Sequence, residues 1–304
     1  IVGLAFSTTA REGDYVPVGH RALGAAGSVP LEVALGPLRP VLENPRLPKI
    51  GHDLKCDAIL LARRGVHLAG LEIDTMIVSY LVDATRSGHN LEDLALEHTA
   101  YRALTLEDIC GKGAKAVSLA EVPVEAALDY ACERADLAGQ LSPILSGLLT
   151  KDGLDEVYRT LELPLVPVLV DIERAGVRID AAALLAQSRQ IEQELAQRTT
   201  EIFRLAGGAF NINSPKQLSE ILFEKLKLPV LKRTGATRTP STAVEVLEEL
   251  ALGHDLPRLI LDWRGLMKLK GTYIDALPQL VNPETGRVHT SFNQAVAATG
   301  RLSS

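Results

Sequence analysis

This sequence has few of the residues that build disulfide frameworks and metal clusters. Its 304 residues include only 3 cysteines and 1 tryptophan, and aromatic residues make up 4% of the chain. The cysteines, Cys56, Cys110 and Cys132, are too few and too scattered for a disulfide scaffold or a zinc site. Such cysteine usage fits a reducing compartment, so we expect a cytoplasmic protein.

Long apolar runs and metal-ligand spacings are also missing. No apolar run reaches the roughly 18 residues that a membrane span needs, so we expect no membrane partner. The histidines His52, His67, His89 and His289 are isolated, and each is better explained as an ordinary polar residue than as a ligand. The remaining composition, with 46% hydrophobic and 23% charged residues, is ordinary for a globular chain of two domains.

The chain opens on IVGLAFS without a starting methionine and closes on RLSS without a terminal helix or tail. We therefore expect a fragment of a longer protein. The net charge of −6 lies entirely in residues 1–149, whereas residues 150–304 are balanced. Within that second half, 215–240 is basic, which favours contacts with phosphate groups; a solvated lysine-rich face is the alternative.

The first half alternates short strands and helices. We expect a hairpin from 1–9 and 14–18, helices over 31–44, 54–64 and 74–83, and strands near PKIGH and HLAGLEI. In the helical stretch 123–148, the spacing predicts that Val124, Ala127, Leu128, Ala131 and Ala135 face the core. KDGLD at 151–155 is typical of a hinge between domains.

The second half is predominantly helical. Helices are predicted over 181–206 and 256–280, and a strand over 287–292. SPKQ at 214–217 and TAVE at 242–245 indicate two capping boxes, the first with Pro215 as the first helical residue. LKRTGATRTP between them is predicted to be an exposed basic loop.

Several runs together resemble one family. RVHTSFNQAVAATGRLSS is similar to the segment that enters the palm of the family A DNA polymerases of bacteria, and WRGLMKLKGTYIDALP to their last thumb helix. FNINSPKQLSEILFEKL and STAVEVLEEL resemble the thumb tip. GHDLKCD and YACERAD resemble two of the three motifs of the attached 3′–5′ exonuclease domain. The resemblance covers essentially the whole chain, in the family's order.

The resemblance implies the fold and the domains. Residues 1–150 would form an α/β, ribonuclease H-like exonuclease domain with a mixed sheet and flanking helices. Residues 151–304 would form a mostly α-helical polymerase thumb and the start of the palm. The palm carboxylates that hold Mg²⁺ for nucleotide addition would follow Ser304, and the first exonuclease motif, Asp-x-Glu, would precede Ile1. On this reading the chain by itself cannot polymerise DNA.

The exonuclease motifs are incomplete. Trimming a 3′ end requires two divalent metals held by carboxylates, and a tyrosine that positions water. The resemblance assigns Asp57 to the second motif and Tyr130 to the third, but Arg134 stands where the family has a carboxylate. At an effective dielectric of about 20, a unit-charge pair near 4 Å is worth roughly 4 kcal/mol, so a permanent cation should exclude the metal. We expect no metal there and no proofreading activity.

Two further expectations concern Arg134. It could pair with Asp57, or with Asp53, which would turn a former metal site into an internal ion pair. The alternative treats Asp57, Tyr130 and Arg134 as a helix cap region and two surface residues, without any catalytic role.

The resemblance also implies duplex-binding residues. The residues at the thumb tip lie at the starts of two helices, where free backbone N–H groups favour phosphate. Arg264 and Lys268 lie four residues apart on one helix. Thr299 and Arg301 correspond to a minor-groove contact near the primer terminus. Simple capping and solvated cations are the alternatives. The helix-start residues are Asn211, Asn213, Ser214, Lys216, Ser241 and Thr242.

The function implied is that of part of a template-directed DNA polymerase in replication or repair. Its partners would be primer-template DNA and deoxynucleoside triphosphates, and we expect a monomer in the bacterial nucleoid. An active 3′–5′ exonuclease and a non-catalytic DNA-binding module are the alternatives.

Overall fold

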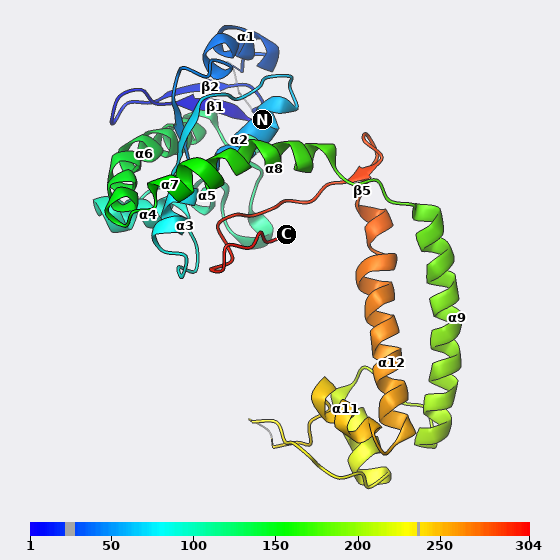
Figure 1. Ribbon diagram of the computed structural model, residues 1–304. Helices are drawn as coiled ribbons and strands as arrows, with labels where there is room; N and C mark the ends of the chain where they lie inside the picture. Colours follow the sequence, from blue (N-terminus) through cyan, green and yellow to red (C-terminus); the bar gives the residue numbers. More distant parts are fainter. Residues whose placement is uncertain (22–27, 236–237) are drawn as a thin grey trace. The chain divides into compact units, whose positions relative to one another are not determined.

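The computed structural model describes residues 1–21, 28–235 and 238–304, and the chain forms two compact units (Figure 1). Unit 1 comprises Ile1–Ala175 together with Thr290–Ser304, and unit 2 comprises Gly176–His289. The predicted boundary near residue 150 therefore lies within unit 1. The reason is that residues after the predicted hinge carry apolar side chains, including Val166 and Leu169, that are buried in the cores of unit 1.

The strands of unit 1 form two separate pairs. β1 (Gly3–Phe6) and β2 (Asp14–Pro17) make the predicted antiparallel hairpin, with Leu4 opposite Val16. β3 (Lys49–Gly51) and β4 (Leu71–Asp74) are parallel. This combination of short strands with many helices confirms the predicted α/β class. In the described residues the strands of this unit form separate antiparallel and parallel pairs, not the one mixed sheet that was expected.

Helices supply most of unit 1, and the predicted helices over 31–44, 54–64 and 74–83 are confirmed with shorter ends. Among the described residues, three apolar clusters hold them together: one around α3, α4 and α6, one around α1, α2 and α8, and a small one where α5 meets the start of α6. The helical elements are α1 (Leu31–Leu42), α2 (Leu54–Ala62), α3 (Thr75–Val82), α4 (Leu91–Thr99), α5 (Leu106–Cys110), η1 (Gly113–Lys115), η2 (Leu119–Glu121), α6 (Val124–Lys151), α7 (Asp155–Val157), η3 (Tyr158–Glu162) and α8 (Leu163–Ala175).

The buried face of α6 differs from the predicted stripe. Ala127 is buried, but Leu128 is 41% exposed. The first turns of α6 pack against α5 and the β1–β2 hairpin, whereas its later turns enter the larger cluster through Leu137, Leu141 and Leu145. The stripe prediction was therefore wrong at Leu128, because the early and late turns of one long helix meet different neighbours.

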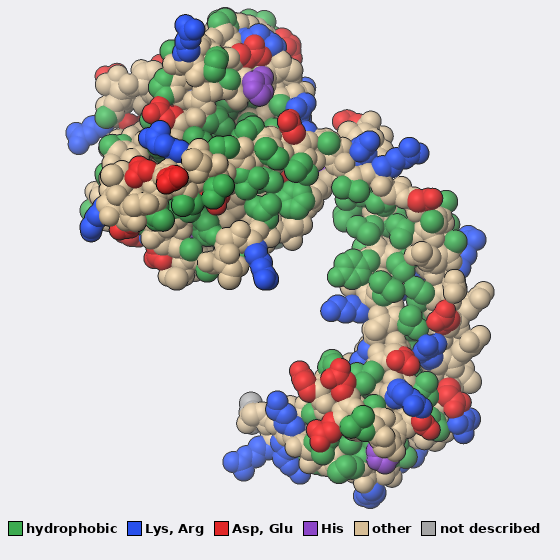
Figure 2. All heavy atoms as spheres, in the orientation of Figure 1, with side chains coloured by type: hydrophobic (Ala, Val, Ile, Leu, Met, Phe, Trp, Pro, Cys, Tyr) green, Lys and Arg blue, Asp and Glu red, His purple; other side chains and the backbone are tan. Residues whose placement is uncertain are grey.

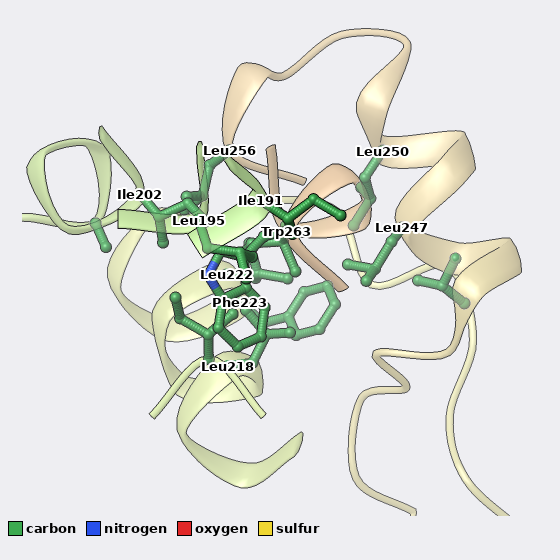
Figure 3. Packing of buried hydrophobic residues seen from close by; sticks show 14 of the residues in the cluster. Ile191, Leu195, Ile202, Leu218, Leu222, Phe223, Leu247, Leu250, Leu256 and Trp263 are labelled. Carbon is green, nitrogen blue, oxygen red and sulfur yellow. The ribbon is translucent and has the colours of Figure 1, made fainter. Parts of the chain in front are cut away.

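Unit 2 is built on two long helices that pack together, α9 (Ala181–Ala206) and α12 (Asp255–Leu269). Side chains from α9, α12, the elements between them and Ile274 form one apolar core, in which Leu218, Leu222 and Leu247 are fully buried (Figure 3). The remaining elements are α10 (Pro215–Ser219), η4 (Glu220–Lys225), α11 (Val244–Ala251), η5 (Lys270–Ile274), η6 (Leu277–Leu280), β5 (Val281–Asn282) and β6 (Arg287–Val288).

Local signals in unit 2 were confirmed in part. Helix 181–206 has its predicted ends, and Ser214 caps α10 with Pro215 as the first helical residue. The two capping boxes are wrong, because the Gln217 side chain accepts from the backbone N–H of Asn211 instead. α11 starts at Val244 without a side-chain cap. The predicted strand 287–292 is reduced to two residues, because within the described part of the chain β6 pairs with the two residues of β5 and with Val177 and no further.

Of the predicted basic loop, residues 236–237 lie outside the described residues. The flanking residues Arg233 and Pro240 form an isolated antiparallel bridge, and the Lys232 carbonyl accepts from the N–H of Ser241.

Candidate functional site

The GHDLKCD motif lies against Asp74, a residue that sequence reasoning did not select. Asp74 ends β4 and is only 1% exposed. Its carboxylate accepts backbone N–H groups at the starts of two helices, from Leu54 at 2.8 Å for α2 and from Met76 at 3.0 Å for α3. The signal available in the sequence was an aspartate directly after an apolar strand and before a helix.

Asp57 lies on the first turn of α2, beside this cap. Its side chain is exposed, and nearby protein atoms partly desolvate the carboxylate. This desolvation, followed by the charges of Asp53 and Asp74, raises the pKa of Asp57 to about 7. Burial likewise raises the pKa of Asp74 to about 6, against the opposing effect of its backbone hydrogen bonds. The site is therefore a set of acids that disfavour one another's charge.

Arg134 binds a partner that the sequence did not predict. Its guanidinium forms an ion pair with Glu92 of α4 and lies over the Tyr130 ring, with 5.4 Å between Cζ and the ring centroid. The expected pairing with Asp57 or Asp53 was wrong, because Glu92 is within reach of Arg134 across the α4–α6 contact. Arg134 still lowers the pKa of Asp57, so its charge acts on the acids without an ion pair.

Tyr130 and His52 are two further titratable residues on which the charge of Arg134 acts. Burial raises the pKa of Tyr130, which keeps its hydroxyl protonated at neutral pH. His52, which the sequence left as an ordinary polar residue, lies 2.9 Å from the Thr75 hydroxyl. Burial, followed by the charge of Arg134, lowers the pKa of His52 to about 3, so this imidazole is neutral.

These residues do not fit a divalent metal centre. Several acceptor positions of Asp74 are occupied by backbone N–H groups, and Arg134 places a cation at the position of the expected third-motif ligand. In residues 1–21, 28–235 and 238–304, no three His, Cys, Asp or Glu side chains are grouped to hold a metal. The site is a polar cluster in which Asp74 caps two helices and Arg134 pairs with Glu92.

The duplex-binding residues predicted at the start of α10 lie at the surface. Asn211, Asn213 and Lys216 are exposed, and Ser214 is half-buried. The Asn211 side chain accepts from the N–H of Asn213 at 3.0 Å, which shapes the turn before the helix. Figure 2 shows Lys and Arg side chains, mixed with acidic ones, on the lobe of unit 2 that carries α11.

The predicted duplex-binding residues before α11 are more deeply buried than those at the start of α10. Ser241 and Thr242 are each 8% exposed, and Ser241 accepts from the N–H of Ala243. Arg264 donates to the carbonyls of Thr242 and Ile212, and burial lowers its pKa. Arg264 thus joins α12 to the segments that lead into α10 and α11, whereas Lys268, on the next turn of α12, is exposed.

Thr299 and Arg301 are exposed and belong to unit 1. They lie on the loop 293–303, whose two ends are joined by reciprocal backbone hydrogen bonds between Asn293 and Ser303 at 2.7 and 3.0 Å. The structure therefore places them in a different compact unit from the other predicted duplex-binding residues.

Comparison with known proteins identifies the class. The family model for 3′–5′ exonuclease matches residues 2–150, and that for DNA polymerase family A matches residues 181–304. The DNA polymerase I of Pseudomonas aeruginosa is 43% identical over 308 aligned residues, which cover 100% of this chain and 34% of that protein. That of Chloroflexus aurantiacus is 41% identical, covering 100% of this chain and 32% of that protein.

A solved structure of a polymerase domain resembles this chain as well. The POL domain of Pol1 from M. smegmatis, in complex with DNA primer-template and dNTP, matches with a TM-score of 0.77 and 28% identity. The match covers 96% of this chain and 46% of that one. An α/β unit matched by the exonuclease model, followed by a helical segment matched by the polymerase model, is the combination found in the exonuclease-bearing class of polymerases. This chain belongs to DNA polymerase family A. It spans about a third of the length of the curated relatives it matches.

No helix in the described ranges is long and apolar enough to cross a membrane.

Proposed function

We propose that this chain is part of a template-directed DNA polymerase, in which unit 2 binds the primer-template duplex. The observation that carries the proposal is the match of the chain to family A polymerases along nearly its whole length, including one solved with DNA primer-template and dNTP. The exposed Asn211, Asn213 and Lys216 support it, because they put amide groups and a cation at one helix start. Ser214, Ser241, Thr242, Arg264 and Lys268 are proposed to shape or extend the same surface.

The proposal also covers the metal, the substrates, the oligomeric state and the location of the complete protein. In the complete polymerase, Mg²⁺ would be held by carboxylates that are not among the residues of this sequence, and deoxynucleoside triphosphates would be the substrates. The protein would act as a monomer in the cytoplasm, at the nucleoid, which agrees with its unpaired cysteines. Thr299 and Arg301 would contact the minor groove near the primer terminus.

Duplex binding by this chain tests the proposal. Affinity for a primer-template duplex, measured by fluorescence anisotropy, should fall steeply with salt because binding releases counterions. Lys216→Ala should weaken binding and reduce the slope of log affinity against log salt by about 1. Lys112→Ala is the matched control, since Lys112 is an exposed lysine of unit 1 in an ion pair with Glu107. Binding without salt dependence, or an equal effect of both variants, would contradict the proposal.

We also propose that the exonuclease-like unit does not proofread. The support is the Arg134–Glu92 ion pair at the position of the expected third-motif ligand. A protein carrying this sequence behind an Asp-x-Glu pair should show no metal-dependent trimming of single-stranded DNA 3′ ends. Trimming well above background that is lost in the Asp57→Asn variant would instead establish the alternative of an active 3′–5′ exonuclease. The match to the exonuclease family and the retained Asp57 and Tyr130 support that alternative.

A further inference from the structure

A buried ion pair in unit 1 joins two helices far apart in the sequence. Lys55 on α2 and Glu173 on α8 lie with Nζ and Oε1 2.5 Å apart, and their side chains are only 9% and 7% exposed. Taking two charges out of water is expensive, and an apolar pair of similar volume usually stabilises a core at least as well. The retained charges therefore point to a role beyond packing.

The ion pair holds the backbone of a third segment. Lys55 Nζ donates to the carbonyl of Phe292 at 2.6 Å, and the N–H of Phe292 donates to Glu173 Oε1 at 2.7 Å. Both polar backbone groups of one residue are thus satisfied by the two members of the pair. An apolar pair could fill the same space but would leave the Phe292 N–H and carbonyl without these partners.

Two more contacts hold the residues that follow. Gln294 is 6% exposed, and its Nε2 donates to the carbonyl and carboxylate of Glu162 at 3.0 and 2.8 Å. The Tyr80 hydroxyl donates to the carbonyl of Ala297 at 2.7 Å. Residues 292–297 are therefore held to the rest of unit 1 by α2, α3, η3 and α8, and the Asn293–Ser303 pair joins the two ends of the loop 293–303.

Beyond these attachments the loop is open to solvent. Gly300 turns the chain with φ of +75°, and Thr299 and Arg301 on either side of it are exposed. The loop therefore has a hydrogen-bonded base and carries an exposed cation, Arg301, beside its turn. A long side chain on a held loop loses less conformational freedom on binding than one on a free loop, which favours accurate placement.

We propose that Lys55 and Glu173 are positioning residues for Arg301, so that the exonuclease-like unit presents this arginine to the minor groove of the primer-template duplex. The inference rests on the proposed polymerase function and deepens it. The unit then serves nucleotide addition through the residues that hold the loop, independently of any trimming activity.

A double-mutant cycle in the complete polymerase tests the proposal. Lys55→Met with Glu173→Leu removes both charges together, so neither is left buried alone. We expect this pair to slow single-nucleotide addition at saturating substrate by about tenfold, because a displaced contact near the reacting end is costly. Arg301→Ala should also slow addition. Adding the pair to Arg301→Ala should cause no further slowing, because the pair acts through Arg301.

The other outcomes separate the possible failures. Equal slowing by the pair with and without Arg301 would show a merely structural role and overturn the inference, as would an unchanged rate. Lys112→Met, in an exposed ion pair, should leave the rate unchanged. If the pair variant does not fold, Tyr80→Phe decides, because it removes only the Ala297 contact; an unchanged rate then overturns the inference. Failure of the unmodified protein to extend any primer would overturn the proposed function itself.

Discussion

At the scale of single residues, Arg134 shows how a cation at a carboxylate position can be paired with a neighbouring acid. The motif places it where a carboxylate would bind metal, and a lone guanidinium among acids suggested a pairing with Asp57. Instead Glu92 takes the ion pair and Tyr130 takes the face of the guanidinium. Asp57 is left with a carboxylate whose charge is disfavoured by its surroundings.

This leads to a pH-dependent prediction for Asp57. Its pKa is about 7 in the folded protein and near 4 in an unfolded chain, so folding disfavours its charged form. The contribution of Asp57 to stability should fall as pH rises from about 4 to about 7. Asp57→Asn should therefore raise the melting temperature at pH 8 by roughly 1–3 °C, a modest shift because solvent reaches the group, and change it little at pH 4.

Asp83 provides a control of opposite sign. Hydrogen bonds from the Thr85 hydroxyl and N–H lower the pKa of Asp83, so its contribution is present at neutral pH and lost as pH falls. Asp83→Asn should lower the melting temperature at pH 8 and have less effect in acid. If Asp57→Asn lost stability at pH 8 as Asp83→Asn does, the account of the acid cluster would be wrong.

At the scale of elements, Asp74 determines where two helices begin. Its side chain is the cap of α3, and it also accepts the N–H groups of Asp53 and Leu54 at the start of α2. One buried carboxylate therefore satisfies backbone donors at the starts of two helices that flank the parallel β3–β4 pair.

Asp74→Ala should destabilise unit 1 by about 3 kcal/mol, because it leaves several buried N–H groups without acceptors. Asp74→Asn should lose less, since its amide oxygen can still accept. Urea unfolding followed by far-ultraviolet circular dichroism would measure both. Equal losses for Ala and Asn would show that the hydrogen bonds are not the source of the effect.

At the scale of the whole molecule, unit 2 has the features of an independent folding unit. The buried residues of its apolar core run from Ile191 to Ile274 and all belong to unit 2, and its two ends meet through reciprocal backbone hydrogen bonds of Val177 and Val288 at 2.8 and 2.9 Å. A segment with its own core and adjacent ends can usually be excised.

We expect the segment Gly176–His289 to fold alone and to melt cooperatively by circular dichroism. Leu247→Ala, at a fully buried position, should destabilise it by about 3 kcal/mol, whereas Leu252→Ala, at a position 90% exposed, should have little effect. A gradual, non-cooperative melt, or equal effects of the two substitutions, would contradict an independent core.

Short-range patterns in the sequence determined the local structure of this protein. The ends of helix 181–206, the Ser214 cap and the β1–β2 hairpin all depend on neighbouring residues, whose periodicity and hydrogen bonds are visible in the chain. Family membership also follows from contiguous motifs. These features require no knowledge of what packs against them.

Tertiary structure alone decided which distant residues meet. Glu92 reaches Arg134 across 42 residues, and Lys55 binds Phe292 across 237. Several acids could have served Arg134, and the sequence does not say which one the packing of α4 on α6 would bring near. Local propensity sets which segments become helices, but the choice among chemically equivalent partners depends on how those helices pack.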